Sequence, residues 1–398
     1  MSLDPRFFRH QHGRLVGALV RRLGARHLDL AEEAASEAFA RAARTWPLQG
    51  LPERPASWLY VVARNYAVDQ LRRAAWLQER LPALVAPAAD PTPADETLEL
   101  TFMCCHPALS RRDQVALTLK AVAGLGTAQL AAAFLVPEAT LAQRLVRAKR
   151  RLLEVGAELS LPDPEALPAR LGAVLDVLYL AYTAGHQAQD GGAEGLGASL
   201  VDEVRRLGEA LLDRTETARP EVHALLALVL LGSARFPARI REGAFVPLAA
   251  QDRGAWDRAR LDAGLAHLAR ADRGPTLSSF HLLAGIEACH ALAPSVADTD
   301  WPRIVGLYDD LLQLAPSPVL RLNRVVALHS PAGTPPRSRA SSRPSSPTSP
   351  TTPLHAAQAE LRLAAGDAAG ARAAWERALT HAGSDPERGA YRQRLAAL

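Results

Sequence analysis

The sequence predicts an all-helical protein in which small helical modules are followed by a longer helical extension. Its 398 residues exceed what one hydrophobic core usually holds, so we expect roughly two or three domains. Hydrophobic residues make up 48% of the chain and aromatic residues only 5%, and Ala, Leu and Arg, which favour helices, dominate the composition. Along most of the chain, apolar residues recur at the spacing of amphipathic helices.

Residues 1–80 are expected to form one compact module of three helices. The first is RLVGALVRRL, whose Leu and Val residues share a stripe. The second, DLAEEAASEAFARAARTW, turns its alanines inward and its acids outward, with Asp29 as the N-cap. After the loop PLQGLPERP, Pro55 suits the first turn of a third helix, ASWLYVVARNYAVDQLRR.

A second module is predicted over residues 98–156. It follows a Pro- and Ala-rich stretch, LPALVAPAADPTPADE, which interrupts helical periodicity and predicts a flexible linker over residues 81–97. The module contains a helix-turn-helix pattern. Thr127 is expected to cap the helix TAQLAAAF, LVPEA forms the turn, and a last helix opens around Thr140 and runs through Arg151.

The rest of the chain reads as a long helical extension with one interruption. Residues 160–329 contain amphipathic helices such as LPARLGAVLDVLYLAYTAG and LVDEVRRLGEALLD. Residues 330–353 lack acids, are rich in Pro and Ser, and are expected to be disordered because they cannot bury a core. Residues 354–398 predict a hairpin like that of a tetratricopeptide (TPR) repeat, which suggests stacked helical pairs.

Charge and cysteine content narrow the class of protein. Residues 1–156 carry 21 Lys and Arg against 15 Asp and Glu, whereas the remainder carries 25 against 27. The basic excess therefore lies in the N-terminal part, where a polyanion would bind. No apolar run approaches the length of a membrane span, no secretion signal is evident, and the three cysteines suit a reducing compartment, so we expect a cytoplasmic protein without membrane contact.

The helix that opens near Thr140 has the features of a helix that reads DNA. It carries Gln143 and several cations, with no acid before Glu154. Presented by a helix-turn-helix, it can enter the major groove with Gln or Arg at base edges and other cations on phosphates. The alternative, for this module taken alone, is a solvated basic face on a core hairpin.

The stretch ARNYAVDQLRRAAW also has two interpretations. Asp69 can pair with Arg72 or Arg73 at helical spacing, which would only stabilise the helix. Asn65, however, carries an amide that can donate to and accept from a base edge at once. The nearby aromatic residues could stack on unpaired bases, although each is more typical of a core: Trp46, Trp58, Tyr60 and Tyr66.

The chain resembles an extracytoplasmic-function (ECF) sigma factor of bacterial RNA polymerase. The resemblance lies in the order of the two modules and the linker, and in the motifs RNYAVDQLRR and PEATLAQRLVRAKRR. The stretch FMCCHPALSRRDQVALTLKAVAGLGTAQLAAAFLVPEATLAQRLVRAKRR is especially similar to the subgroup with a long C-terminal TPR-containing extension. The resemblance covers nearly the whole chain except residues 330–353. It implies that residues 1–80 are sigma region 2 and residues 98–156 are region 4.

The resemblance also implies a role for individual residues. An acidic helix would dock on the clamp helices of the polymerase β′ subunit, and its candidate contacts are Asp29, Glu32, Glu33 and Glu37. Region 4 would contact the β flap. The loop 46–54 and the helix after it would hold a base flipped from the promoter minus-ten element, with candidates Arg64, Asn65, Asp69, Arg72 and Arg73. The minus-thirty-five candidates are Thr140, Ala142, Gln143, Arg144, Val146, Arg147 and Lys149. Many sigma factors place a basic residue where Ala142 stands, so the element's sequence stays open.

Other classes of function explain less of the sequence. An enzyme or metal site would have to use Cys104, Cys105 and His106, or Cys289 and His290, but adjacent residues on a helix point about 100° apart, and no second Cys pair is present. The Gly-rich stretch 185–197 lacks a nucleotide-binding spacing and predicts a flexible loop. We therefore expect no enzyme and no cofactor.

A dimeric helix-turn-helix regulator with a helical sensory domain is the alternative function, but it gives the first module no role. The extension is expected to act in cis or on a protein partner.

Overall fold

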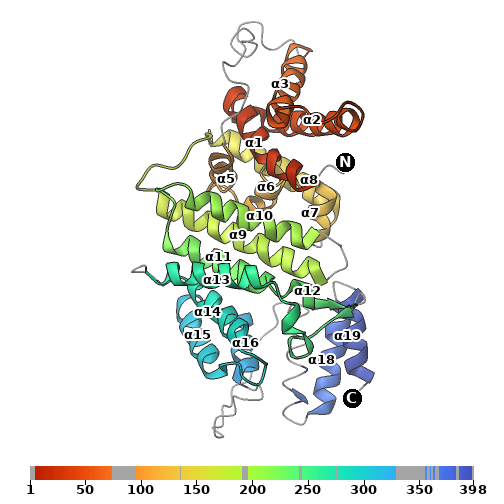
Figure 1. The fold of residues 1–398 in the computed structure, drawn as a ribbon, viewed down its shortest axis with the longest axis vertical. Coiled ribbons are helices and arrows are strands. Elements are labelled where there is room, and N and C mark those ends of the chain that lie inside the picture. The colour runs from red at the N-terminus through yellow and green to blue at the C-terminus, as the bar shows by residue number, and fades with distance from the viewer. Residues whose placement is uncertain are drawn as a thin grey trace. The chain divides into compact units, whose positions relative to one another are not determined.

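In the residues that the computed structural model describes, the chain is all-helical, as the sequence predicts, apart from one short β-ladder (Figure 1). The chain divides into two compact units, Met1–Ala181 and Tyr182–Leu398, and each is described by itself. The structure describes residues 5–73, 96–134, 136–190, 196–241, 244–273, 277–328, 355, 359, 362–363, 367–381 and 385–396. Most of the expected linker and all of the Pro- and Ser-rich segment lie outside the described residues, as does part of the expected C-terminal hairpin.

The first unit contains both predicted modules and the start of the extension. Its elements are α1 (Pro5–Leu23), the 3-10 turn η1 (Ala25–His27), α2 (Leu28–Gln49), α3 (Pro55–Arg73), α5 (Thr97–Cys104), α6 (Arg111–Ala121), α7 (Thr127–Ala133), α8 (Glu138–Glu154) and the first part of α9 (Leu167–Asp190).

Helix α2 packs closely on α1 and α3 because its inner face is made of alanines. These residues are almost completely buried: Ala31, Ala34, Ala35, Ala38 and Ala42. Small side chains let the helix axes approach, and leucines of the flanking helices fill the space, among them Leu19 of α1 and Leu59 of α3. The predicted three-helix module is therefore formed around α2.

The two modules, which the sequence predicts as separate bodies on a tether, belong to one unit. A Cβ atom built on Gly13 of α1 would lie 2.7 Å from the carbonyl oxygen of Val122, which follows α6. Gly124 has a φ of 69°, and a Cβ atom there would lie 2.6 Å from the ring of His12. Only glycine fits at such contacts, and the sequence pattern did not reveal this packing.

His12 gives this packing a pH dependence. Burial, with help from the charge of Lys120, lowers the pKa of His12 to about 4. Between pH 6.5 and about 4 the unfolded chain therefore binds a proton that the folded chain does not, so stability is highest above pH 6.5 and falls as the pH falls. A full shift of this size corresponds to about 3 kcal/mol at pH 4. The unfolding midpoint of His12→Asn should fall less between pH 7 and pH 4 than that of the wild type; equal falls would contradict the assignment.

The second unit contains the remainder of the extension. Its elements are the end of α9, α10 (Leu196–Leu212), α11 (Pro220–Ser233), α12 (Phe236–Arg239), β1 (Ile240–Arg241), β2 (Ala244–Phe245), η2 (Leu248–Ala250), η3 (Arg253–Ala255), α13 (Arg258–Ala271), α14 (Ser279–Leu292), α15 (Trp301–Leu314), α16 (Pro318–Leu328), α18 (Ala368–His381) and α19 (Asp385–Ala396). The antiparallel strands pair Ile240 with Phe245 and Arg241 with Ala244.

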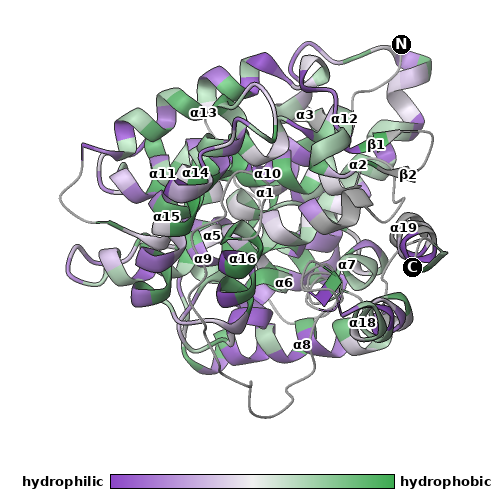
Figure 2. Cartoon of the chain, turned by 90° about the horizontal axis from the view of Figure 1, so that it is seen from below, coloured by the Kyte–Doolittle hydropathy of each residue, from purple (hydrophilic) through white to green (hydrophobic). Residues whose placement is uncertain are grey.

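Helix α11 is the centre of this unit. Nearly all of its residues are buried, and it packs on α10, α13 and α14. Gly264 lets α13 approach closely, since a Cβ atom there would lie 2.8 Å from Leu231 of α11. Helix α13 is amphipathic and carries both hydrophobic and hydrophilic residues (Figure 2). The stretch Pro220–Arg239 is apolar and long enough to cross a membrane, but 72% of its most apolar 18-residue window is buried in the protein, as in a core helix.

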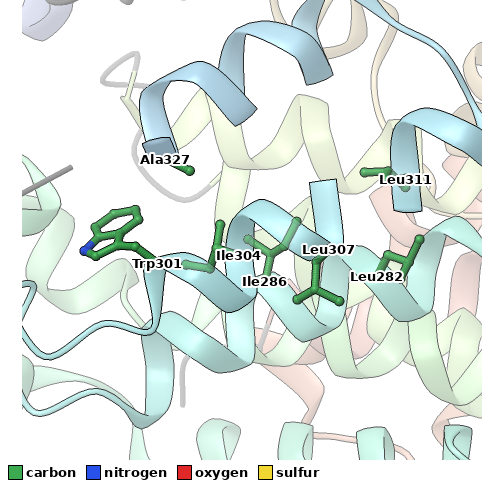
Figure 3. Packing of buried hydrophobic residues seen from close by; sticks show 7 residues of the cluster. All are labelled: Leu282, Ile286, Trp301, Ile304, Leu307, Leu311 and Ala327. Carbon is green, nitrogen blue, oxygen red and sulfur yellow. The ribbon is translucent and has the colours of Figure 1, made fainter. Parts of the chain in front are cut away.

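Helices α14, α15 and α16 continue the unit as stacked neighbours. Their shared core contains seven buried residues contributed by all three helices (Figure 3): Leu282, Ile286, Trp301, Ile304, Leu307, Leu311 and Ala327. Farther along the chain, α18 and α19 form a hairpin in which the rings of Trp375 and Tyr391 lie 5.3 Å apart. The expected helix after the Gly-Asp turn is therefore present.

Several predicted boundaries are wrong for identifiable reasons. His27, not Asp29, is the N-cap of α2, and α2 continues past Pro47 until Gly50, whose φ of 86° ends the helix. Thr127 lies inside α7 after the N-cap Gly126. The Gly-rich stretch begins as helix, because α9 continues through residues 185–190 before the first pair of adjacent glycines.

Candidate nucleic-acid and polymerase interface

Helix α8 presents one face to solvent and buries the other. Leucines and an alanine recur on its buried side: Leu141, Leu145, Ala148 and Leu152. The opposite side carries Ala142, Gln143, Val146 and Arg147, all exposed, and these four residues line a shallow hollow of the surface. Val146 is 67% exposed although it is apolar. A row of exposed polar and small apolar side chains on the second helix of a helix-turn-helix suits contact with base edges and thymine methyl groups.

Not all minus-thirty-five candidates lie on this row. Thr140 is exposed at the start of α8, but the side chain of Arg144 is only 20% exposed and lies 3.7 Å from the carboxylate of Asp113 on α6. Lys149 lies elsewhere on α8 and bonds to acids of α2. The structure therefore groups Ala142, Gln143, Val146 and Arg147 and separates Arg144 and Lys149 from them.

The minus-ten candidates share the C-terminal half of α3. Asn65 is exposed, and its Oδ1 accepts a hydrogen bond of 3.0 Å from Arg64. Asp69 and Arg72 form an ion pair of 3.8 Å, and Arg73 is exposed nearby. The expected brace between Asp69 and an arginine is therefore present, and Asn65 stands beside it on the helix surface.

The aromatic residues of this module mostly form core. Trp46 is 4% exposed and packs on Phe8 and Trp58 at ring distances of 5.8 and 5.4 Å. Tyr60 is 6% exposed. Such burial excludes stacking of bases on Trp46 and Tyr60 in this form of the protein.

The acids of α2 form hydrogen bonds and ion pairs with other residues of the first unit. Lys149 Nζ donates to Asp29 Oδ1 and, over 2.9 Å, to Glu32 Oε2. The hydroxyl of Tyr66 donates to Glu33 Oε1, and Arg44 lies 3.2 Å from Glu37. These acids form a row along one side of α2, and Asp29, Glu33 and Glu37 all face solvent more than Glu32 does.

Two arginines form hydrogen bonds between the extension and the second module, and sequence patterns did not reveal them. Arg111 on α6 donates to the carbonyl of Ala173 over 3.0 Å and to Asp176 over 2.8 Å, both on α9. Arg170 of α9 donates to the carbonyl of Phe102 over 2.7 Å. More than 60 residues separate the partners, so no local spacing signals them.

The three cysteines pack in or against hydrophobic cores. Cys104 and Cys105 are buried, and burial raises the pKa of Cys105 to about 11 and that of Cys104 as well, so both hold their protons at neutral pH. Cys289 packs against the core in Figure 3, whereas the ring of His290 lies edge-on against Trp301. Within the described residues, no group of three or more His, Cys, Asp or Glu residues is placed to hold a metal ion.

Comparison with known proteins finds family matches in three parts of the chain. Sigma-70 region 2 matches residues 8–77, sigma-70 region 4 matches residues 99–152, and a family of unknown function (DUF6596) matches residues 170–272. The chain is 38% identical over 394 residues to "Uncharacterized protein R00370" of Rhizobium meliloti (strain 1021), covering 96% of this chain and 92% of that protein. No solved structure matches the chain.

The first unit combines a helix-turn-helix that has an exposed polar face with a three-helix module that carries an acidic row and an exposed Asn. This arrangement suits a DNA-binding transcription protein. The matched regions make the class specific. The chain belongs to the sigma-70 family and is an ECF-type sigma factor with a helical C-terminal extension. It binds core RNA polymerase and promoter DNA and acts in promoter-specific transcription, and the sigma families are not families of enzymes.

Proposed function

We propose that this sigma factor reads the minus-thirty-five element with the exposed row of α8 and the minus-ten element with α3. The observation that carries the proposal is the exposure of Gln143, Val146 and Arg147 opposite a fully packed stripe. Residues held this way can face the major groove without disturbing the core. Asn65, with Arg72 and Arg73 about two turns later, supplies the corresponding surface for an unpaired base and its phosphates.

We further infer that the acidic row of α2 docks on the β′ clamp helices, and that region 4 meets the β flap. The acids lie on one side of α2, which suits a basic partner. The protein would act in the cytoplasm, where core polymerase and promoter DNA are found. The domain limits follow the sequence: region 2 over residues 1–80, region 4 over residues 98–156, and the extension from residue 160.

The extension is proposed to regulate region 4 in cis. Its first helix, α9, is held on α5 and α6 by Arg111 and Arg170, as described above. Residues of α9 such as Leu171, Val174 and Leu175 are buried within the unit. A helix fastened by polar bonds to the base of the helix-turn-helix can transmit a change in the extension to the DNA-reading helix.

The double variant Arg111→Ala and Arg170→Ala is expected to raise promoter-directed run-off transcription by about three- to fivefold. The half-exposed ion pair of Arg111 with Asp176 contributes roughly 0.2–1 kcal/mol, and the hydrogen bonds of Arg111 and Arg170 to backbone carbonyls contribute about 1 kcal/mol each, so their loss should release α9 without unfolding the chain. The variant Arg112→Ala, which removes an exposed arginine of the same helix, serves as the control. If hydrogen exchange shows α9 released and transcription does not change, regulation through this contact is wrong.

The alternative, a dimeric helix-turn-helix regulator, makes a different prediction. Such a protein would bind promoter duplex specifically without polymerase. A sigma factor should bind duplex poorly alone, because the minus-ten base must be unstacked at a cost of a few kcal/mol. Specific gel shifts by the purified chain alone would therefore favour the regulator.

A further inference from the structure

A group of polar side chains lies inside the second unit, where the segment after α11 meets η3 and α14. Its members are Arg235, Arg253, Trp256, Glu287 and His290. Arg253 Nη1 donates to the carbonyl of His290 over 2.6 Å, and its guanidinium carbon lies 4.6 Å from the centre of the Trp256 ring. Arg235 pairs with Glu287 at 3.3 Å, and Trp256 packs in the same core as Ala288 of α14. These contacts bring the five side chains together.

Four nitrogen atoms of this group are buried and have no hydrogen-bond partner among the described residues: Arg235 Nε, Arg253 Nη2, Trp256 Nε1 and His290 Nδ1. Buried polar atoms of folded proteins are nearly always paired. Guanidinium and indole nitrogens can only donate, and an imidazole Nδ1 donates in one of its two neutral forms. The group therefore offers several donors in one place, and an acceptor from outside the chain would complete it.

The charges of the group favour an acceptor that is an anion. Its side chains include two guanidinium groups but one carboxylate, and that carboxylate pairs with Arg235. Burial and the charge of Arg235 lower the pKa of Arg253, and the exposed Asp298 offsets this only in part. Burial also lowers the pKa of His290, so its ring is neutral at pH 7 and keeps one proton to donate. Buried charges are usually paired, and Arg253 has no ion pair among the described residues.

We propose that this polar group is a binding site for a small carboxylate ligand. A carboxylate carries one negative charge, which balances two arginines less one glutamate, and its two oxygens accept about four hydrogen bonds. Arg235 bonds to Glu287 through Nη2, so its Nε stays available to the ligand. Arg253 and His290 are partly exposed, and the ligand enters beside them. The extension thus carries a receptor site for a small anion, in addition to the DNA and polymerase surfaces of the first unit.

The indole N–H signals of the intact chain test this proposal, with acetate as the probe. The chain has six tryptophans, and NMR of protein labelled on the tryptophan ring nitrogen resolves their signals, which Trp→Phe substitutions assign. Sodium acetate replaces sodium chloride at constant ionic strength. The Trp256 signal should shift to a saturating end point. Trp46 and Trp375 also have indole nitrogens without a partner among the described residues, and their signals should not move.

Two conservative variants test the donors. Arg235→Lys keeps a positive charge beside Glu287 but removes Nε, and His290→Phe keeps a ring against Trp301 but removes Nδ1. Each should weaken acetate binding by at least about tenfold, because hydrogen bonds to charged groups are among the stronger ones. The matched control is Arg321→Lys, the same substitution at an exposed position of α16, which should leave the acetate affinity unchanged.

Three results would overturn the proposal. The Trp256 signal of the wild type does not respond to acetate, or it moves together with those of Trp46 and Trp375. Phosphate gives the saturating shift and acetate does not, which excludes a carboxylate as the ligand. Arg235→Lys and His290→Phe bind acetate as tightly as the wild type, which places the ligand elsewhere. If a variant does not fold, the titration of the wild type decides.

Discussion

Replacing Arg147 by alanine is expected to weaken holoenzyme binding to the minus-thirty-five element by about tenfold to a hundredfold. Arg147 is exposed on α8, one helical turn after Gln143, on the side opposite the buried leucines. A guanidinium there can form two hydrogen bonds to a guanine edge, and a good bidentate pair is worth about 1–3 kcal/mol of discrimination. The measurement is an equilibrium titration of holoenzyme with promoter fragments.

The control for this prediction is Arg151→Ala on the same helix. Arg151 pairs with Glu154 at 3.2 Å, so its loss removes one charge without touching the exposed row. A base contact predicts that Arg147→Ala also relaxes the preference among minus-thirty-five sequences. A uniform loss on every sequence, with a salt slope lower by about one, would assign Arg147 to phosphate and contradict base reading.

Replacing Asn65 by alanine is expected to lower run-off transcription about tenfold without changing the affinity for core polymerase. Asn65 is exposed on α3, and its Oδ1 is oriented by Arg64, so its amide is held at the helix surface. A base flipped from the promoter loses its stacking, and a hydrogen bond to an amide is one of the contacts that offset that cost. Initiation at saturating holoenzyme therefore reports the lost contact.

A pre-melted promoter distinguishes base reading from duplex opening. When the minus-ten segment is mismatched, the cost of unstacking disappears for the wild type and for Asn65→Ala alike. A remaining defect in the variant then measures the contact to the base itself. Equal activity of the two proteins on this template would contradict the assignment of Asn65.

The helices and their buried faces could be predicted from local spacing. The stripe Leu141, Leu145 and Leu152 on α8 and the alanine face of α2 repeat at helical period, and both are buried. Exposure of Gln143 and Arg147 follows from the same period. Local patterns are sufficient here because each helix buries one side against its neighbours in the chain.

Packing between distant segments could not be predicted from the sequence. Lys149 follows Asp29 by 120 residues, and on its own helix it appeared to be one more DNA-facing cation. Gly124 and His12 have no feature that signals their contact, although it excludes any side chain at Gly124. The sequence predicts two tethered modules and gives no sign of this packing, because the pattern of one helix does not identify a partner far along the chain.

Run-off transcription tests the central claim most directly. Core polymerase, the full chain and a library of promoter templates are combined, with core alone and the chain alone as controls. We predict discrete transcripts that require both proteins, start at a fixed site, and are reduced by Asn65→Ala and Arg147→Ala but not by Arg151→Ala. Specific binding of the chain to duplex DNA without polymerase, with no transcript from any template when core is added, would contradict its assignment as a sigma factor.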